Sequence, residues 1–256
     1  MSPVSAAGPK LEVRQASKHF GSLVAVSDVS MNVASGELRA IIGPNGAGKT
    51  TFFNLITGFF PPSAGEILLD GQNINRIPAA GRVKLGMGRT FQITEIFAEL
   101  TVRENVRIAV ETGLDFSLRA WLGAADKKKV DDAIDEVLTM ANLGAKADRL
   151  VGELSHGDQR SAEIAMALAL KPSLLLLDEP TAGMGDEETY QVTGLIRRLH
   201  RDSKYTIVLI EHDMRVVFHL ADRISVLAEG KLLAEGTPDE ISRNEHVQNA
   251  YLGKVE

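Results

Sequence analysis

A glycine-rich segment has the spacing G-x-x-x-x-G-K-[ST] and consists of Gly43, Pro44, Asn45, Gly46, Ala47, Gly48, Lys49 and Thr50. An apolar run at 38–42 precedes it and a helical pattern at 50–58 follows it, which is the context that a phosphate-binding loop requires. Glycines let the backbone approach a phosphate, and the N-terminus of the helix adds a positive dipole end. The pattern predicts that Lys49 neutralises the β- and γ-phosphates, Thr50 binds Mg²⁺ and Thr51 donates on the α-phosphate side.

Two adjacent carboxylates follow the apolar run Leu174 to Leu177. An unpaired charge at the end of a buried strand is costly, so Asp178 and Glu179 are expected to have a chemical role. Asp178 is predicted to hold Mg²⁺ through water or together with Thr50. Glu179 is predicted to orient and polarise the attacking water. These carboxylates and the glycine-rich loop together define a P-loop nucleoside triphosphatase, but they do not say which one.

The segment Leu154-Ser155-His156-Gly157-Asp158-Gln159-Arg160 is more specific. It resembles the Leu-Ser-Gly-Gly-Gln signature of ABC ATPases, with His156 in place of the first Gly and Asp158 in place of the Gln. The motifs follow the family's order from about residue 11 to 236. The chain is therefore identified as an ABC transporter ATP-binding subunit.

The resemblance assigns roles to three further residues. It places Phe20 where the family stacks an aromatic ring on adenine, and Gln92, within Gly88-Arg89-Thr90-Phe91-Gln92, in the loop that contributes to catalysis and to Mg²⁺ binding. It makes His212 the switch histidine, with a catalytic role.

By the same resemblance, ATP and Mg²⁺ lie between two ATP-binding subunits, the second being another copy or a homologous chain. One subunit contributes the phosphate loop and the carboxylates, and the other contributes Ser155 and Gly157. Asp158 is expected to turn away from the facing γ-phosphate, or to cap the helix, because two negative charges repel. Gly185 stands where many relatives have an Asp in the loop after Glu179, so that loop's role is not carried over.

The segments "IGPNGAGKTTFFNLITGFFPPSAGEILLDG" and "LLLLDEPTAGM" look most like the ATP-binding subunits of importers of branched-chain and related amino acids. The longer region near 113–129 fits the same group. The resemblance implies integral-membrane permease subunits that dock near Gln92 and 94–106. It also implies a periplasmic or extracellular solute-binding protein that acts indirectly, and a peripheral position on the cytoplasmic face of the inner membrane.

The expected fold is α/β: a P-loop core with an antiparallel β subdomain and an inserted α-helical subdomain. The predicted division is a flexible leader at 1–9, a nucleotide-binding core at 10–94 and 171–256, and a helical subdomain at 95–170. Short apolar or alternating runs predict the strands. They are 11–13, 29–33, 38–42, 66–69, 174–177, 207–210, 222–227 and 232–235, with a final helix at 237–244.

Composition narrows the alternatives. The 256 residues include 28 Lys and Arg against 34 Asp and Glu, and a net charge of −6 disfavours a general nucleic-acid binder. The absence of Cys excludes disulfides, Cys-ligated zinc and thiol catalysis, and suits a reducing cytoplasm. Residues 1–9 lack the pattern of a secretory signal, and the apolar runs are shorter than the ~20 residues of a membrane helix. Two rivals remain: a soluble ABC ATPase of nucleic-acid repair or translation, for which Lys127 to Lys129 is the one basic run, and a P-loop small-molecule kinase.

Overall fold

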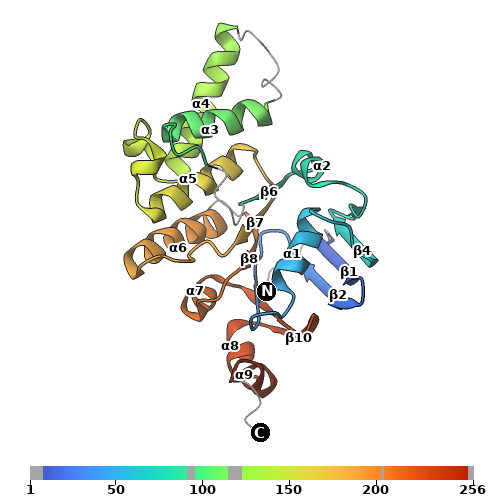
Figure 1. The fold of residues 1–256 in the computed structure, drawn as a ribbon. Coiled ribbons are helices and arrows are strands. Elements are labelled where there is room, and N and C mark those ends of the chain that lie inside the picture. The colour runs from blue at the N-terminus through green and yellow to red at the C-terminus, as the bar shows by residue number, and fades with distance from the viewer. Residues whose placement is uncertain (1–7, 91–95, 115–122, 203–204, 253–256) are drawn as a thin grey trace, which may run out of the picture. The chain divides into compact units, whose positions relative to one another are not determined.

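The computed structural model describes residues 8–90, 96–114, 123–202 and 205–252, the last without its side chain. The chain forms two compact units, Met1–Leu85 with Lys204–Glu256 and Gly86–Ser203. Figure 1 shows the elements of both, and each unit is described below by itself. The division into leader, core and helical subdomain stays a prediction.

The first unit contains an antiparallel sheet with strand order β2-β1-β4-β5. Its strands are β1 (Leu11–Phe20), β2 (Leu23–Val33), β4 (Ala64–Leu69) and β5 (Gln72–Asn73). The β1–β2 pair is much longer than the sequence predicts. The pairing shifts register after Val13, Ala16 and Lys18. Each shift interrupts the strict alternation by which a strand is recognised.

A second set of strands in the same unit carries the phosphate loop. It consists of β3 (Leu38–Ile42), β8 (Thr206–Ile210), β9 (Arg223–Ala228) and β10 (Lys231–Gly236). β3 lies between β8 and β9, parallel to both, and β10 pairs antiparallel with β9. Every residue of β3 and β8 is buried. Continuous apolar runs are typical of parallel strands buried on both faces, and the predicted strands at 38–42 and 207–210 are confirmed.

The helices of the first unit are α1 (Lys49–Thr57), α2 (Ala79–Lys84), α7 (Met214–Leu220), α8 (Pro238–Ser242) and α9 (Glu245–Leu252). The fully buried Arg82 ties α1 to its surroundings. Its guanidinium donates to the carbonyls of Leu55 and Ile56 at the end of α1, and to those of Ile74 and Ile77. Burial lowers the pKa of Arg82 to about 10. The charge is tolerated because four carbonyl oxygens replace its hydration.

The second unit pairs β6 (Met87–Arg89) in parallel with β7 (Leu174–Asp178). Its helices are α3 (Val102–Gly113), α4 (Ala124–Met140), α5 (His156–Ala169) and α6 (Asp186–Arg201), with short 3₁₀ turns η1 (Gly144–Lys146) and η2 (Val151–Glu153). The three helices α3, α4 and α5 pack against one another, and α5 also packs against α6. Val130, Ile134, Val137 and Leu138, which are three or four residues apart or adjacent, form the buried face of α4.

Within the described residues, no helix is both long and apolar enough to cross a membrane.

Candidate nucleotide-binding site

The glycine-rich loop connects β3 to α1 within the first unit. Gly48 is the N-cap residue of α1, with φ 92°, and has no side chain to cap the first turn. A Cβ atom at this position would lie 2.5 Å from the carbonyl oxygen of Ala25, so a larger residue would both strain the backbone and collide. The first-turn N–H groups therefore open onto the loop, which is the geometry that binds phosphate at a helix N-terminus.

Lys49 brings a positive charge into this loop. The side chain is buried, and its Nζ donates to the carbonyl oxygens of Gly43 at 2.7 Å and Pro44 at 3.0 Å. The ammonium is thus folded back over the loop that the N–H groups line. Thr50 is exposed and Thr51 is half-buried, both in the first turn. Backbone donors, an ammonium group and a hydroxyl group fit a nucleoside triphosphate with its magnesium ion.

The strand next to β3 leads to His212. Because β3 and β8 are parallel, the loops that follow them leave from the same edge of the sheet. Glu211 is buried, and its carboxylate accepts from the backbone N–H of His212 at 2.9 Å. The imidazole of His212 is exposed. The first unit therefore places the phosphate loop and His212 along one sheet edge.

Phe20 lies at the end of β1 and is 46% exposed. Its ring packs edge-on against Phe60, with the centroids 5.4 Å apart. The ammonium of Lys18 lies 5.2 Å from the Phe20 centroid and 4.9 Å from that of Phe60. Such contacts hold the ring in place while half of it stays accessible, as an adenine platform requires. Its adenine contact stays a prediction.

One contact to the phosphate loop is not predicted by any sequence motif described above. The hydroxyl of Tyr251, on α9, is hydrogen-bonded to the backbone of Gly43. Partial burial raises the pKa of Tyr251 to about 12, and this hydrogen bond opposes the rise. The C-terminal helix therefore reaches the first residue of the loop.

In the second unit, Asp178 is the last residue of β7 and is 1% exposed. The guanidinium of Arg89 lies 3.7 Å from its carboxylate, and Arg160 donates to its backbone carbonyl. Glu179 follows with φ 46°, a left-handed conformation that is uncommon for a residue with a side chain. The chain turns sharply there, and strained conformations of this kind gather at functional sites.

The signature segment begins α5. Ser155 is its N-cap residue, and the serine Oγ accepts from the backbone N–H of Asp158 at 3.2 Å. Gly157 is the second residue of the helix, and His156 is exposed. Asp158 turns into the unit: its carboxylate accepts from Lys146 Nζ at 2.5 Å and from Gln191 Nε2 at 2.8 Å. The serine therefore caps the helix, and Asp158 turns inward to other partners.

The structure thus brings the predicted residues together in two groups. The first unit holds the phosphate loop, Phe20 and His212, and the second holds Asp178, Glu179 and the signature. Gln92 lies outside the described residues.

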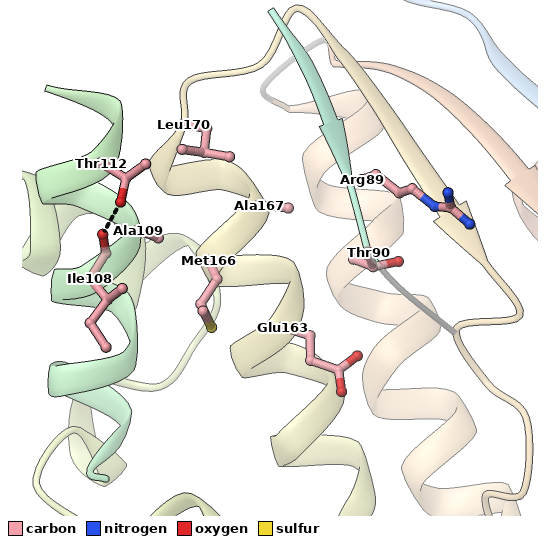
Figure 2. Close-up of a pocket in the computed structure, with 9 residues that line it drawn as sticks. All are labelled: Arg89, Thr90, Ile108, Ala109, Thr112, Glu163, Met166, Ala167 and Leu170. Atoms are coloured by element: carbon pink, nitrogen blue, oxygen red, sulfur yellow. Dashed lines mark hydrogen bonds between the residues drawn. The ribbon is translucent and has the colours of Figure 1, made fainter. Parts of the chain in front are cut away.

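The second unit also contains a pocket of about 230 Å³ between β6, α3 and α5. Figure 2 shows its lining, which consists of Arg89, Thr90, Ile108, Ala109, Thr112, Glu163, Met166, Ala167 and Leu170. Five of these side chains are apolar, and the charged ends of Arg89 and Glu163 lie on the side toward β6 and β7 (Figure 2). An open apolar pocket with a few polar groups is typical of a binding site.

Comparisons with known proteins identify the class. A family model described as "ABC transporter" matches residues 26–182, and one described as "Branched-chain amino acid ATP-binding cassette transporter" matches residues 231–256. The chain belongs to the ABC transporter family, as one of its ATP-binding proteins.

The relatives are matched over nearly their whole length. The chain is 40% identical over 252 residues to the high-affinity branched-chain amino acid transport ATP-binding proteins LivG of Escherichia coli (strain K12) and BraF of Pseudomonas aeruginosa, which covers 96% of this chain and 99% of each relative. It is 34% identical over 244 residues to the lipopolysaccharide export system ATP-binding protein LptB of Escherichia coli (strain K12), covering 95% of this chain and 97% of LptB.

Solved structures give the same result for the fold. The ADP conformation of MJ1267, an ATP-binding cassette of an ABC transporter, has a TM-score of 0.84 at 28% identity, covering 96% of this chain and 99% of that one. The dimeric MJ0796 cassette in a post-hydrolysis state bound to ADP and Pi has a TM-score of 0.74 at 27% identity, covering 89% and 98%. The predicted ABC ATPase fold is confirmed.

The contacts of Asp158 make stability depend on pH. Burial raises the pKa of this carboxyl, but hydrogen bonds from Lys146 and Gln191 and the charge of Lys146 outweigh burial and hold it below its ordinary value. A depressed carboxyl pKa adds stability above the unfolded-state pKa, and that stability is lost as pH falls through the folded-state pKa. We expect Asp158→Asn to lower the free energy of unfolding by about 1–2 kcal/mol near pH 7.

Urea unfolding followed by circular dichroism measures the difference between wild type and variant. It should shrink once the pH falls below about 4, the ordinary range of Asp. The control is Asp148→Asn, whose side chain is 94% exposed. A deficit that persists unchanged at low pH would contradict the charge as its source.

Proposed function

We propose that this chain binds and hydrolyses ATP, and that hydrolysis drives the import of branched-chain amino acids through separate permease subunits. The observation that carries ATP binding is the uncapped N-terminus of α1 with Lys49 folded over the same loop. The transport role rests on LivG and BraF, which the chain matches over 96% of its length.

The proposed roles follow from the chemistry of each side chain. Lys49 compensates the charge of the β- and γ-phosphates, and Glu179 orients the attacking water and accepts its proton. Thr50, Asp178 and Gln92 would hold Mg²⁺, which adds positive charge at the phosphates. His212 faces the same sheet edge as the loop and acts on the γ-phosphate side.

A second ATP-binding subunit completes the proposed site. Ser155 and the N–H groups of α5 form a further set of phosphate donors, and they serve the nucleotide of the facing subunit. Support comes from the dimeric cassette that resembles this chain. The second subunit is another copy or a homologous chain.

The permease is proposed to dock in the pocket between β6, α3 and α5. An apolar side chain of the permease fits against Ile108, Met166 and Leu170, and its polar neighbours meet Arg89 and Glu163 at the edge. The sequence predicted that the permease contacts the region 94–106, which includes Phe97, a residue that is 53% exposed. The pocket adds residues from the second half of α3, such as Ile108 and Thr112, to the proposed contact surface.

Two findings together favour branched-chain amino acids as the transported solute. Identity is 40% to LivG and BraF against 34% to the lipopolysaccharide export protein, and the C-terminal match at 231–256 belongs to a branched-chain amino acid family. The relatives reported above are all transport proteins, which favours this function over nucleic-acid repair or translation. The proposed location is the cytoplasmic face of the inner membrane, with a solute-binding protein on the far side.

Reconstitution with the permease and the solute-binding protein in proteoliposomes tests this function. Leucine uptake should require Mg-ATP and should fall when valine or isoleucine competes. Ile108→Glu puts a charge at the mouth of the apolar pocket, so uptake and permease binding should drop at least about tenfold, given the cost of burying an unpaired charge. ATP affinity should stay unchanged.

Leu150→Glu is the matched control, because Ile108 and Leu150 are exposed to similar extents, 40% and 38%. If both variants keep permease binding, the docking site lies elsewhere. If no branched-chain amino acid is taken up by the wild-type assembly, the cargo assignment is wrong.

A further inference from the structure

Two carboxylates lie at the signature segment, one within it (Asp158) and one from α6 (Glu188), and they are held very differently. Asp158 is 5% exposed and has two short contacts, to Lys146 at 2.5 Å and Gln191 at 2.8 Å. Its carboxylate is held by partners on η1 and α6 and is also hydrogen-bonded to Ser155, the N-cap residue of α5. These contacts leave the backbone N–H of Gly157 to another acceptor.

The second carboxylate comes from α6. Glu188 Oε1 accepts from the backbone N–H of Gly157 at 3.3 Å. Gly157 is the second residue of α5, so its N–H has no acceptor four residues earlier within the helix. A carboxylate at this end of a helix is electrostatically favourable. Glu188 thus sits on one of the donors that the signature is proposed to offer to phosphate.

Glycine is what allows this contact. A Cβ atom at position 157 would lie 3.2 Å from Cβ and 3.4 Å from Cα of Glu188, closer than such contacts usually are. The two helices therefore approach each other here without a side chain between them. The backbone therefore holds Cα and Cβ of Glu188 close to the N-terminus of α5, and the carboxylate can reach the Gly157 N–H from there.

We propose that Glu188 is a placeholder: its carboxylate occupies the Gly157 N–H until the γ-phosphate of ATP in the facing subunit displaces it. This rests on the proposed two-subunit site. A carboxylate and a phosphate are both anionic acceptors for the same donor, and they cannot share it because their charges repel. The contact is long and Glu188 is only half-buried, so the side chain can move aside.

The placeholder sets how much ATP is needed for two subunits to associate. With Glu188 in place, association must move a negative charge from the signature before the phosphate can enter. Without that charge, the same donor is available at once. Glu188 thereby opposes association at low ATP while keeping the N-terminus of α5 satisfied in the single chain.

The test uses association, and not turnover, as its readout. Glu188→Gln is introduced into a Glu179→Gln parent, which is expected to bind ATP without hydrolysing it rapidly. Sedimentation velocity follows association against Mg-ATP concentration, with the second ATP-binding subunit of the transporter added. Removing one charge at a helix terminus should lower the half-maximal ATP concentration roughly two- to fivefold.

Glu187→Gln is the matched control, since it makes the same charge change one residue earlier and Glu187 is exposed. Equal shifts in both variants would reduce the effect to net charge and overturn the inference. Weaker association in Glu188→Gln would make Glu188 a supporting contact, which also overturns it.

A second measurement checks the contact in the single chain. The amide proton resonance of Gly157 should move in Glu188→Gln and stay in place in Glu187→Gln. If the parent associates with Mg-ATP and the Glu188 variant behaves like the control, only this inference fails. If the parent never associates at any ATP concentration, the two-subunit site of the proposed function fails, and the inference with it.

Discussion

Lys49→Ala should abolish most of the ATP affinity of this chain. The ammonium is the buried positive charge of the phosphate loop, held by the carbonyls of Gly43 and Pro44. Without it, the phosphate charge is met only by backbone dipoles and the helix end. Charge-assisted hydrogen bonds contribute about 1.5–3 kcal/mol each. Loss of two of them, one to the β-phosphate and one to the γ-phosphate of ATP, should therefore weaken ATP binding at least about 100-fold.

Isothermal titration calorimetry with Mg-ATP measures this loss. Lys49→Gln is a useful companion, because it keeps most of the side-chain length and removes only the charge, and it should lose nearly as much affinity. Lys127→Ala, on the exposed face of α4, is the control for a missing lysine. Near-normal affinity in both Lys49 variants would contradict the assignment of the loop.

Glu179→Gln should separate binding from hydrolysis. The amide has the size of the carboxylate but cannot accept a proton from the attacking water, and this form of catalysis contributes about 10²–10⁴-fold. We expect phosphate release to fall by about that factor while ATP affinity is retained. Mg-ATP should then hold two subunits together for long enough to be seen by light scattering.

The backbone at this position needs its own control. Glu179 has φ 46° and Glu229 has φ 50°, so Glu229→Gln repeats the same exchange in the same left-handed conformation, at an exposed site after β9. It should leave phosphate release unchanged. Wild-type turnover in Glu179→Gln would remove this residue from catalysis. Full hydrolysis by a monomer, independent of protein concentration, would overturn the two-subunit mechanism.

Buried elements were the most predictable part of the fold. Leu174 to Leu177 is a continuous apolar run and forms most of β7, and Leu38 to Ile42, which is apolar except for Arg39, forms β3. The hairpin of β1 and β2 was predicted only in part, because register shifts and exposed residues such as Leu23 break the alternation. The last helix, α9, was missed, since a single helix was expected to close the chain.

The candidate site likewise contains residues that the sequence predicted and residues that it did not. Motif spacing located the phosphate loop and the carboxylates after β7, because those residues depend on local backbone geometry. The partners of the signature could not be predicted, since Lys146, Gln191 and Glu188 reach it only through the packing of η1, α5 and α6. The same holds for Tyr251, which is more than 200 residues from Gly43 in the sequence.

The order of strands around β3 has a consequence for synthesis on the ribosome. β3 pairs with β8 and β9, which are made only after the whole second unit has been translated. At about 5–20 residues per second, the strand that carries the phosphate loop waits on the order of 10–40 seconds for both neighbours. During that interval a strand in which four of the five residues are apolar has neither edge paired, which makes it prone to aggregation. A nascent chain halted before β8 should therefore gain no ATP-binding loop and should recruit chaperones, whereas one halted beyond β10 should be released from them.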